Sequence, residues 1–208
     1  MQQVVRVISG FGIFAMIAIV PPVYNMHVNR TYRNFRVVRP GILYRSGQLT
    51  REGLAQLIHD HGIRTVIALR DSYPPGKPPP DWDEEQFCLK EELYYYRLLP
   101  KSWWLTDGKA PADENVRKFQ EIIDDPKHYP ILIHCMAGTH RTGAYCAIYR
   151  MEVEHWTNAE AMAELQTGGY RHLFEEEDIR GYLEEYTPRW RILSVKPKAP
   201  EPAPSARR

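Results

Sequence analysis

A chain of 208 residues with a formal net charge of +1 suits one compact domain with tails better than two full domains. Its apolar content of 43% is enough to bury a sizeable core, which excludes an intrinsically disordered protein. Because 27 Lys and Arg residues are balanced by 26 Asp and Glu residues, nucleic acid is not expected as a partner. The odd number of cysteines, Cys88, Cys135 and Cys146, leaves at least one free thiol and indicates a reducing compartment.

The N-terminal segment, residues 1–30, predicts a membrane anchor. No formally charged residue occurs over residues 7–26, and the apolar run over residues 7–20 approaches the roughly 20 residues that span a bilayer. More arginines follow this run than precede it, which predicts a membrane-anchored protein with a cytoplasmic domain. The alternatives are a signal peptide, a buried helix and an unanchored cytoplasmic protein.

Strands and helices alternate in the remainder of the predicted domain, residues 31–192. The apolar pattern predicts extended segments at residues 37–44, 65–69, 93–99 and 131–134. Helices are predicted at residues 50–61, 81–92, 111–125 and 141–156, and a capping box at Thr157 opens another. This order predicts an α/β fold with a central, mostly parallel sheet of four to five strands flanked by helices on both faces. The proline-rich residues 193–208 are predicted to be a disordered tail.

The segment after the strand at residues 131–134 predicts a phosphate-binding loop. Cys135 follows the strand, Gly138 lies in the loop, and Arg141 comes six positions after Cys135, where the next helix begins. A loop that connects the end of a buried strand to a helix N-terminus points successive backbone N–H groups at one site, and an anion fits there. The predicted phosphate ligands are Met136, Ala137, Gly138, Thr139, His140 and Arg141.

Cys135 is the predicted nucleophile, because the positive potential of such a loop also favours a thiolate. Arg141 carries a planar fork that can hold two phosphoryl oxygens, and Thr142 can donate a hydrogen bond to the sulfur. His134 is predicted to orient the loop. The alternatives are that Cys135 is a small core residue, that His140 only faces solvent, or that His134, Cys135 and His140 bind a metal. The last lacks a second pair of ligands, so we predict neither a metal nor a cofactor.

This segment resembles the signature of the protein tyrosine and dual-specificity phosphatase superfamily: His134 and Cys135 are followed by five residues and then by Arg141 and Thr142. Residues 34–38 and 43–48 resemble the opening of compact dual-specificity phosphatases, so the resemblance extends over about residues 34–186. It implies a phosphomonoester hydrolase that works through a cysteinyl-phosphate without a metal.

A general acid is expected on a loop upstream of the nucleophile, and Asp107 and Asp113 are the candidates. Residues 107–111, Asp-Gly-Lys-Ala-Pro, resemble the Asp-Gly-Ala-Pro acid loop of small phosphatases of the regenerating-liver type, so Asp107 is preferred. Asp113 is predicted to cap the following helix, and an Asp-Gly turn is the other interpretation of Asp107. Trp103 and Trp104 either flank the substrate or hold the loop to the domain.

The sequence leaves the substrate open. The atypical plant and fungal enzymes of this superfamily, some of which act on inositol pyrophosphates, carry Lys-His-Arg where this chain has Thr139, His140 and Arg141. The candidate substrates are therefore a phosphorylated protein, a phosphoinositide or other lipid, and an inositol phosphate. A catalytically dead phosphate-binding module is the alternative from another class, and a monomer is predicted. Arg45 is predicted to pair with a carboxylate at the sheet edge rather than with substrate.

Overall fold

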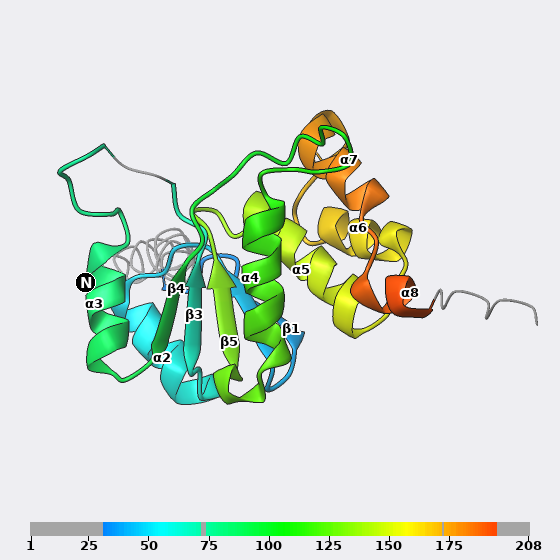
Figure 1. Cartoon of the computed structure of the whole chain (residues 1–208). Helices are drawn as coiled ribbons and strands as arrows, with labels where there is room; N and C mark the ends of the chain where they lie inside the picture. The colour runs from blue at the N-terminus through cyan, green and yellow to red at the C-terminus, as the bar shows by residue number, and fades with distance from the viewer. Residues whose placement is uncertain (1–30, 72–73, 172, 195–208) are drawn as a thin grey trace, which may run out of the picture.

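The computed structural model describes residues 31–71, 74–171 and 173–194. Its strands are β1 (Arg36–Arg39), β2 (Leu43–Ser46), β3 (Thr65–Ala68), β4 (Tyr94–Arg97) and β5 (Ile131–His134). Its helices, labelled in Figure 1, are α2 (Arg51–His61), α3 (Trp82–Lys90), α4 (Asp113–Asp124), α5 (His140–Val153), α6 (Asn158–Thr167), α7 (Glu177–Glu185) and α8 (Arg189–Ser194). Single turns of 3-10 helix lie at Pro126–His128 and Leu173–Glu175.

The five strands form one sheet in the order β1-β2-β5-β3-β4. Only β1 is antiparallel; it forms a hairpin with β2, so the predicted extended segment at residues 37–44 is two strands joined by a turn at Gly41. In the parallel part, His134 lies opposite Ser46 of β2 and Ala68 of β3. Loops that follow the carboxyl ends of such strands meet at one edge, so the segments after Ser46, Ala68 and His134 converge. The predicted fold class is confirmed.

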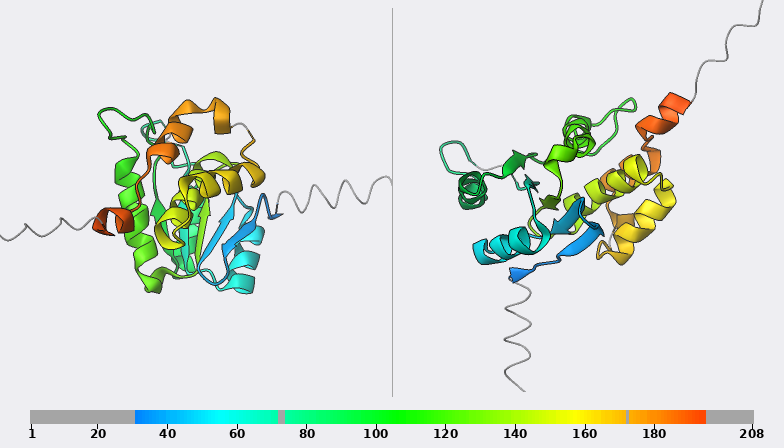
Figure 2. Two further views of the ribbon diagram at one scale, coloured as in Figure 1. Left: turned by 90° about the vertical axis from the view of Figure 1, so that its right-hand side faces the viewer. Right: turned by 90° about the horizontal axis from the view of Figure 1, so that it is seen from below.

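Helices cover both faces of the sheet (Figures 1 and 2). On one face, α2 and α3 pack on Val66 and Leu132. On the other face, residues of α4 and α5 form one buried cluster with Ile67 and Ile133, and α6 and α7 extend this cluster by packing against α5. Successive residues of a strand point to opposite faces of the sheet. Because helices cover both faces, Val66 and Ile67 of β3 are both buried, and so are Leu132 and Ile133 of β5, as the continuous apolar runs predicted.

Local signals set both ends of α2 and the start of α6. The Thr50 hydroxyl accepts a hydrogen bond from Gly53 N at 3.1 Å, and Gly62 ends the helix with a φ of 63°. The capping box that Thr157 forms with Glu160 is also present. These predictions are confirmed, whereas α5 ends at Val153, before the predicted residue 156.

The predicted membrane location is wrong. Among residues 31–71, 74–171 and 173–194, no helix is both long and apolar enough to cross a bilayer. The longest helix there, α5, has 14 residues, fewer than the roughly 20 that a span requires. The segment that carried the prediction, residues 7–20, and most of the predicted tail lie outside the described residues. The predicted domain limits and the predicted monomer stay predictions.

Candidate active site

Cys135 begins the loop between β5 and α5, and its side chain is buried. Gly138 curls this loop with a φ of 73°, and its backbone N–H donates a hydrogen bond to Cys135 Sγ at 3.2 Å. A Cβ on Gly138 would lie 2.5 Å from Ser46 O and even closer to Gly47 N, so no larger residue fits without moving backbone. The loop is thus pressed against the end of β2, with its N–H groups around the sulfur.

The surroundings of Cys135 favour its thiolate. Burial raises the pKa of the thiol, but the hydroxyl of Thr142 and the backbone N–H groups of Thr142, Gly138 and Ala137 together lower it below its ordinary value. The Thr142 hydroxyl is buried and has no hydrogen-bond partner among the described residues, so it is free to turn towards the sulfur. The structure thus brings together the Cys135 sulfur, the N–H groups of the loop and Thr142, and the roles predicted for these residues stay predictions.

Side chains from the N-terminal part of the domain hold the carbonyls of the loop. Arg45, buried on β2, donates from Nη2 to Gly138 O at 2.6 Å and to Thr139 O at 3.4 Å. Asn34 donates from Nδ2 to Ala137 O at 2.7 Å. Arg45 therefore binds backbone carbonyls rather than the predicted carboxylate. Because these carbonyls are engaged by side chains of other segments, the N–H groups of the loop are left for an anion.

Arg141, on the first turn of α5, is oriented by the segment that follows β3. Its Nη1 donates to Leu69 O at 2.7 Å, and its Nη2 pairs with Asp71 Oδ1 at 2.9 Å. Sequence reasoning missed Asp71. The signal was its place just after a strand that neighbours β5, where the parallel register brings it to the loop.

His134 and His140 flank the loop but face different partners. His134 Nε2 lies 2.7 Å from Glu84 Oε1 of α3, a residue that the sequence did not single out. His140 Nδ1 lies 3.2 Å from Glu176 Oε1, and its ring stacks on Tyr170 with centroids 4.3 Å apart. The side chain of His140, predicted to bind phosphate, therefore points to the segment before α7.

The two candidate acids differ in their surroundings. Asp107 is exposed at a turn with a φ of 52°, closed by backbone hydrogen bonds between Thr106 and Lys109. Asp113 accepts hydrogen bonds from Ala110 N at 2.9 Å and from the Tyr182 hydroxyl at 2.8 Å. Asp113 thus ties the loop to α7. No contact among the described residues brings either carboxylate to Cys135.

The two tryptophans before this turn also differ. Trp103 is buried and packs edge-on against Tyr145 and Tyr182, with ring centroids 5.5 and 4.9 Å away, so it holds the loop to the domain. Trp104 is exposed. Within the described ranges, no group of three or more His, Cys, Asp and Glu side chains is placed to hold a metal ion.

The family described as "DSP-PTPase phosphatase fused to NAD+ Kinase" matches residues 15–180. The chain belongs to this dual-specificity phosphatase family. The phosphatase is 27% identical over 131 residues to the tyrosine-protein phosphatase-like protein OCA2 of Saccharomyces cerevisiae, covering 62% of each chain. It is 30% identical over 138 residues to the inositol diphosphatase DSP3 of Arabidopsis thaliana, covering 64% of this chain and 61% of DSP3. The phosphatase thus spans about three fifths of the length of these curated relatives.

Solved structures share the fold of this phosphatase. The crystal structure of TpbA from Pseudomonas aeruginosa superposes with a TM-score of 0.57 at 21% identity, covering 74% of this chain and 85% of TpbA. The catalytic core of the Saccharomyces cerevisiae PP-IP phosphatase SIW14 superposes with a TM-score of 0.58 at 24% identity, covering 77% and 91%. The predicted superfamily and the prediction of a cysteine-dependent phosphatase are confirmed at the level of the family. The roles of single residues stay predictions.

Proposed function

We propose that this phosphatase hydrolyses phosphomonoesters in two displacements at Cys135. The thiolate attacks phosphorus, the S–P bond forms, and the P–O bond to the leaving group breaks. The loop N–H groups and Arg141 stabilise the charge on the equatorial oxygens. Water then attacks the cysteinyl-phosphate, which releases inorganic phosphate and restores the thiolate. The observation that carries this proposal is the buried Cys135 sulfur with its lowered pKa and its hydrogen bond from Gly138 N.

Arg141 is prepared for this role by its contacts on the protein side. A guanidinium has about five N–H groups, and Leu69 and Asp71 engage only part of them. The other N–H groups remain for phosphoryl oxygens. Because the two contacts fix the plane of the fork before substrate arrives, less conformational entropy is lost when phosphate binds.

Asp107 is proposed as the acid that protonates the leaving oxygen and then as the base that takes the proton of the attacking water. Its competitor Asp113 already accepts two hydrogen bonds, from Ala110 N and the Tyr182 hydroxyl. Trp103 anchors the base of the same loop, while Asp107 is exposed at its tip. Such a loop closes over substrate by bringing its tip to the site, and it does so without unpacking its base.

The site favours a substrate with a single phosphoryl group, such as a phosphorylated protein side chain, over a densely phosphorylated inositol. Thr139 stands next to His140, and Glu176 engages the His140 ring. Asp71 adds a carboxylate beside Arg141. These two acidic groups would repel additional phosphates near the loop. The complex of TpbA with pTyr shows that a relative of the same fold accepts such a ligand.

Phosphate release by the full chain tests the proposal. We expect cleavage of p-nitrophenyl phosphate and of a phosphotyrosine peptide, inhibition by vanadate, and complete loss of activity in Cys135→Ser. Cys146→Ser is the matched control, because this buried thiol has a pKa raised by burial to about 11 and takes no part in the reaction. A wild-type chain that binds phosphate but releases none would instead identify a binding module, and faster cleavage of inositol phosphates would overturn the substrate assignment.

A further inference from the structure

A carboxylate of α3 contacts the residue that precedes the nucleophile. Glu84 Oε1 lies 2.7 Å from His134 Nε2, and the side chains are only 9% and 2% exposed. A carboxylate oxygen accepts hydrogen bonds, so Nε2 carries the proton that lies between them. His134 Nδ1 is buried without a hydrogen-bond partner among the described residues, so the contact with Glu84 is the one that orients the ring.

The charge of Glu84 also changes the electrostatics behind Cys135. Burial lowers the pKa of His134, but the charge and hydrogen bond of Glu84, together with the backbone and charge of Cys135, raise it above its ordinary value. A Coulombic interaction is mutual. The thiolate that stabilises the imidazolium of His134 is therefore stabilised by it in turn.

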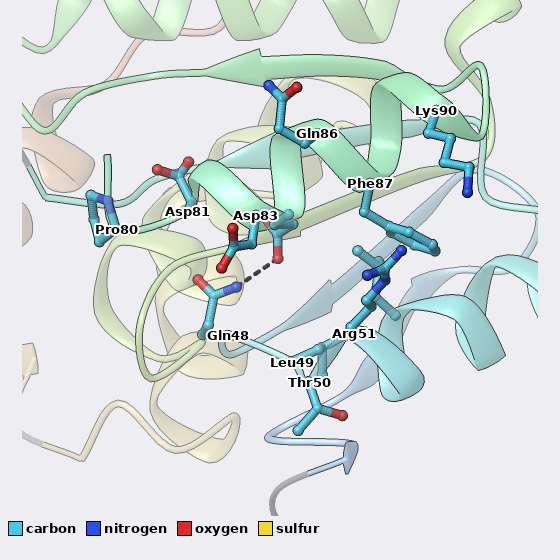
Figure 3. A pocket seen from close by; sticks show the side chains of 12 residues that line it. Gln48, Leu49, Thr50, Arg51, Pro80, Asp81, Asp83, Gln86, Phe87 and Lys90 are labelled. Carbon is cyan, nitrogen blue, oxygen red and sulfur yellow. Dashed lines mark hydrogen bonds between the residues drawn. The ribbon is translucent and has the colours of Figure 1, made fainter. Parts of the chain in front are cut away.

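Glu84 is itself held on both oxygens. Its Oε2 accepts a hydrogen bond from Gln48 Nε2 at 2.6 Å, which is the dashed line in Figure 3. The Tyr95 hydroxyl lies 3.2 Å from Oε1 and 2.5 Å from Asp81 Oδ2. The carboxylate is thus fixed before substrate arrives, as a residue that positions another one must be.

Gln48, which contacts Glu84, also contacts Met136, the residue that follows Cys135. Its backbone N–H donates to Met136 O at 3.1 Å, and its Oε1 accepts from Arg70 Nη1 at 3.0 Å. The same Arg70 nitrogen lies 2.8 Å from Met136 Sδ. Glu84 is therefore connected to His134 before Cys135 and to Met136 after it.

We propose that Glu84 is a positioning residue for the nucleophile, because through His134 and Gln48 it fixes the backbone on both sides of Cys135. The inference deepens the proposed function and rests on it. The neighbouring Glu85 provides a matched control: it lies on the same helix, pairs with Arg97 Nη2 at 2.9 Å, and shows no contact with the loop among the described residues.

The experiment measures the thiolate directly, by the pH dependence of alkylation of the full chain with iodoacetamide. Burial raises the pKa of Cys88 to about 12 and of Cys146 to about 11, so alkylation near neutral pH reports Cys135. The titratable groups that interact with Glu84 or His134 stay unchanged; they are Cys88, Tyr95 and Cys135. Arg70, which contacts Gln48, and Asp81, which contacts Tyr95, also stay unchanged.

We expect Glu84→Gln to raise the apparent pKa of Cys135 by about one unit, which slows alkylation roughly tenfold on the acid side of the curve. The acid limb of kcat/KM should move by the same amount, and Glu85→Gln should leave both curves unchanged. A purely structural role for Glu84 would lower stability without moving either curve. An alkylation curve of Glu84→Gln that superimposes on the wild type overturns the inference.

Two arrangements keep the test decisive. Alkylation needs no turnover, so a wild-type chain that alkylates as a thiolate but releases no phosphate defeats the proposed function while the effect of Glu84 is still measured. If Glu84→Gln does not fold, nitrogen NMR of His134 in the wild type replaces it. We expect Nε2 of His134 to be protonated from about pH 5 to about pH 8, and an unprotonated Nε2 in that range overturns the inference.

Discussion

Substitution of Gly138 by alanine tests whether the shape of the loop determines activity. Gly138 has a φ of 73° and Gly41 a φ of 72°, but a Cβ on Gly41 would meet nothing within 4 Å, whereas one on Gly138 would lie 2.5 Å from Ser46 O. Both alanine variants therefore carry the same backbone strain, about 1–2 kcal/mol. Only Gly138→Ala adds a collision with backbone, which costs about 1–3 kcal/mol more.

The collision in Gly138→Ala should also lower the catalytic activity. Ser46 lies on a buried strand and cannot yield, so the loop must move, and the Gly138 N–H moves away from Cys135 Sγ. A displacement of about 1 Å at a reacting group lowers kcat/KM about 100-fold. Urea unfolding gives the free energies, and hydrolysis of p-nitrophenyl phosphate gives the kinetics. The reasoning is refuted if Gly138→Ala retains the kcat/KM of Gly41→Ala.

Three further predictions concern the acid, the thiolate and the substrate. Asp107→Asn should lower kcat about 100- to 10,000-fold for a phosphopeptide without changing the urea midpoint, and an unchanged kcat would exclude Asp107 as the acid. The pKa of Cys135 is lowered in the folded state, so the free energy of unfolding of the wild type, relative to that of Cys135→Ser, should rise as the pH rises from that pKa to the ordinary thiol value. This gain should be lost as the pH falls again. A difference between the two proteins that is the same at all pH values would contradict the prediction. Glu176→Gln should release the His140 ring and raise kcat/KM for inositol phosphates a few-fold relative to a phosphotyrosine peptide, measured as phosphate release, and an unchanged ratio would show that this pair does not select substrate.

Short-range features of this phosphatase could be predicted from its sequence. Cys135, Gly138, Arg141 and Thr142 lie within one strand-loop-helix unit, and their order alone indicates a phosphate loop. Helix ends behave in the same way, because the cap at Thr50 joins groups only three residues apart. The alternation of strands and helices likewise predicted the layers of the sheet, since burial on both faces demands continuous apolar strands.

Local patterns were less reliable for the membrane location and for His140. The apolar run and the arginines that follow it predicted a membrane location, but no described helix has the length and apolarity of a span. His140 has a side chain and a place in the loop that suit phosphate, yet its ring is engaged by Tyr170 and Glu176 from a later part of the chain.

The partners that shape the loop were decided only by the tertiary structure. Asn34 and Arg45 contact it across separations of 103 and 93 residues, and Glu84 contacts His134, just before the loop, across 50 residues. No periodicity or spacing links such residues, because the parallel register of β2, β5 and β3 brings together chain segments that crossover helices keep far apart in sequence. The sequence by itself indicated Cys135 and the loop around it, because these residues lie within one short segment of the chain. The packing of the sheet determined which distant side chains orient them.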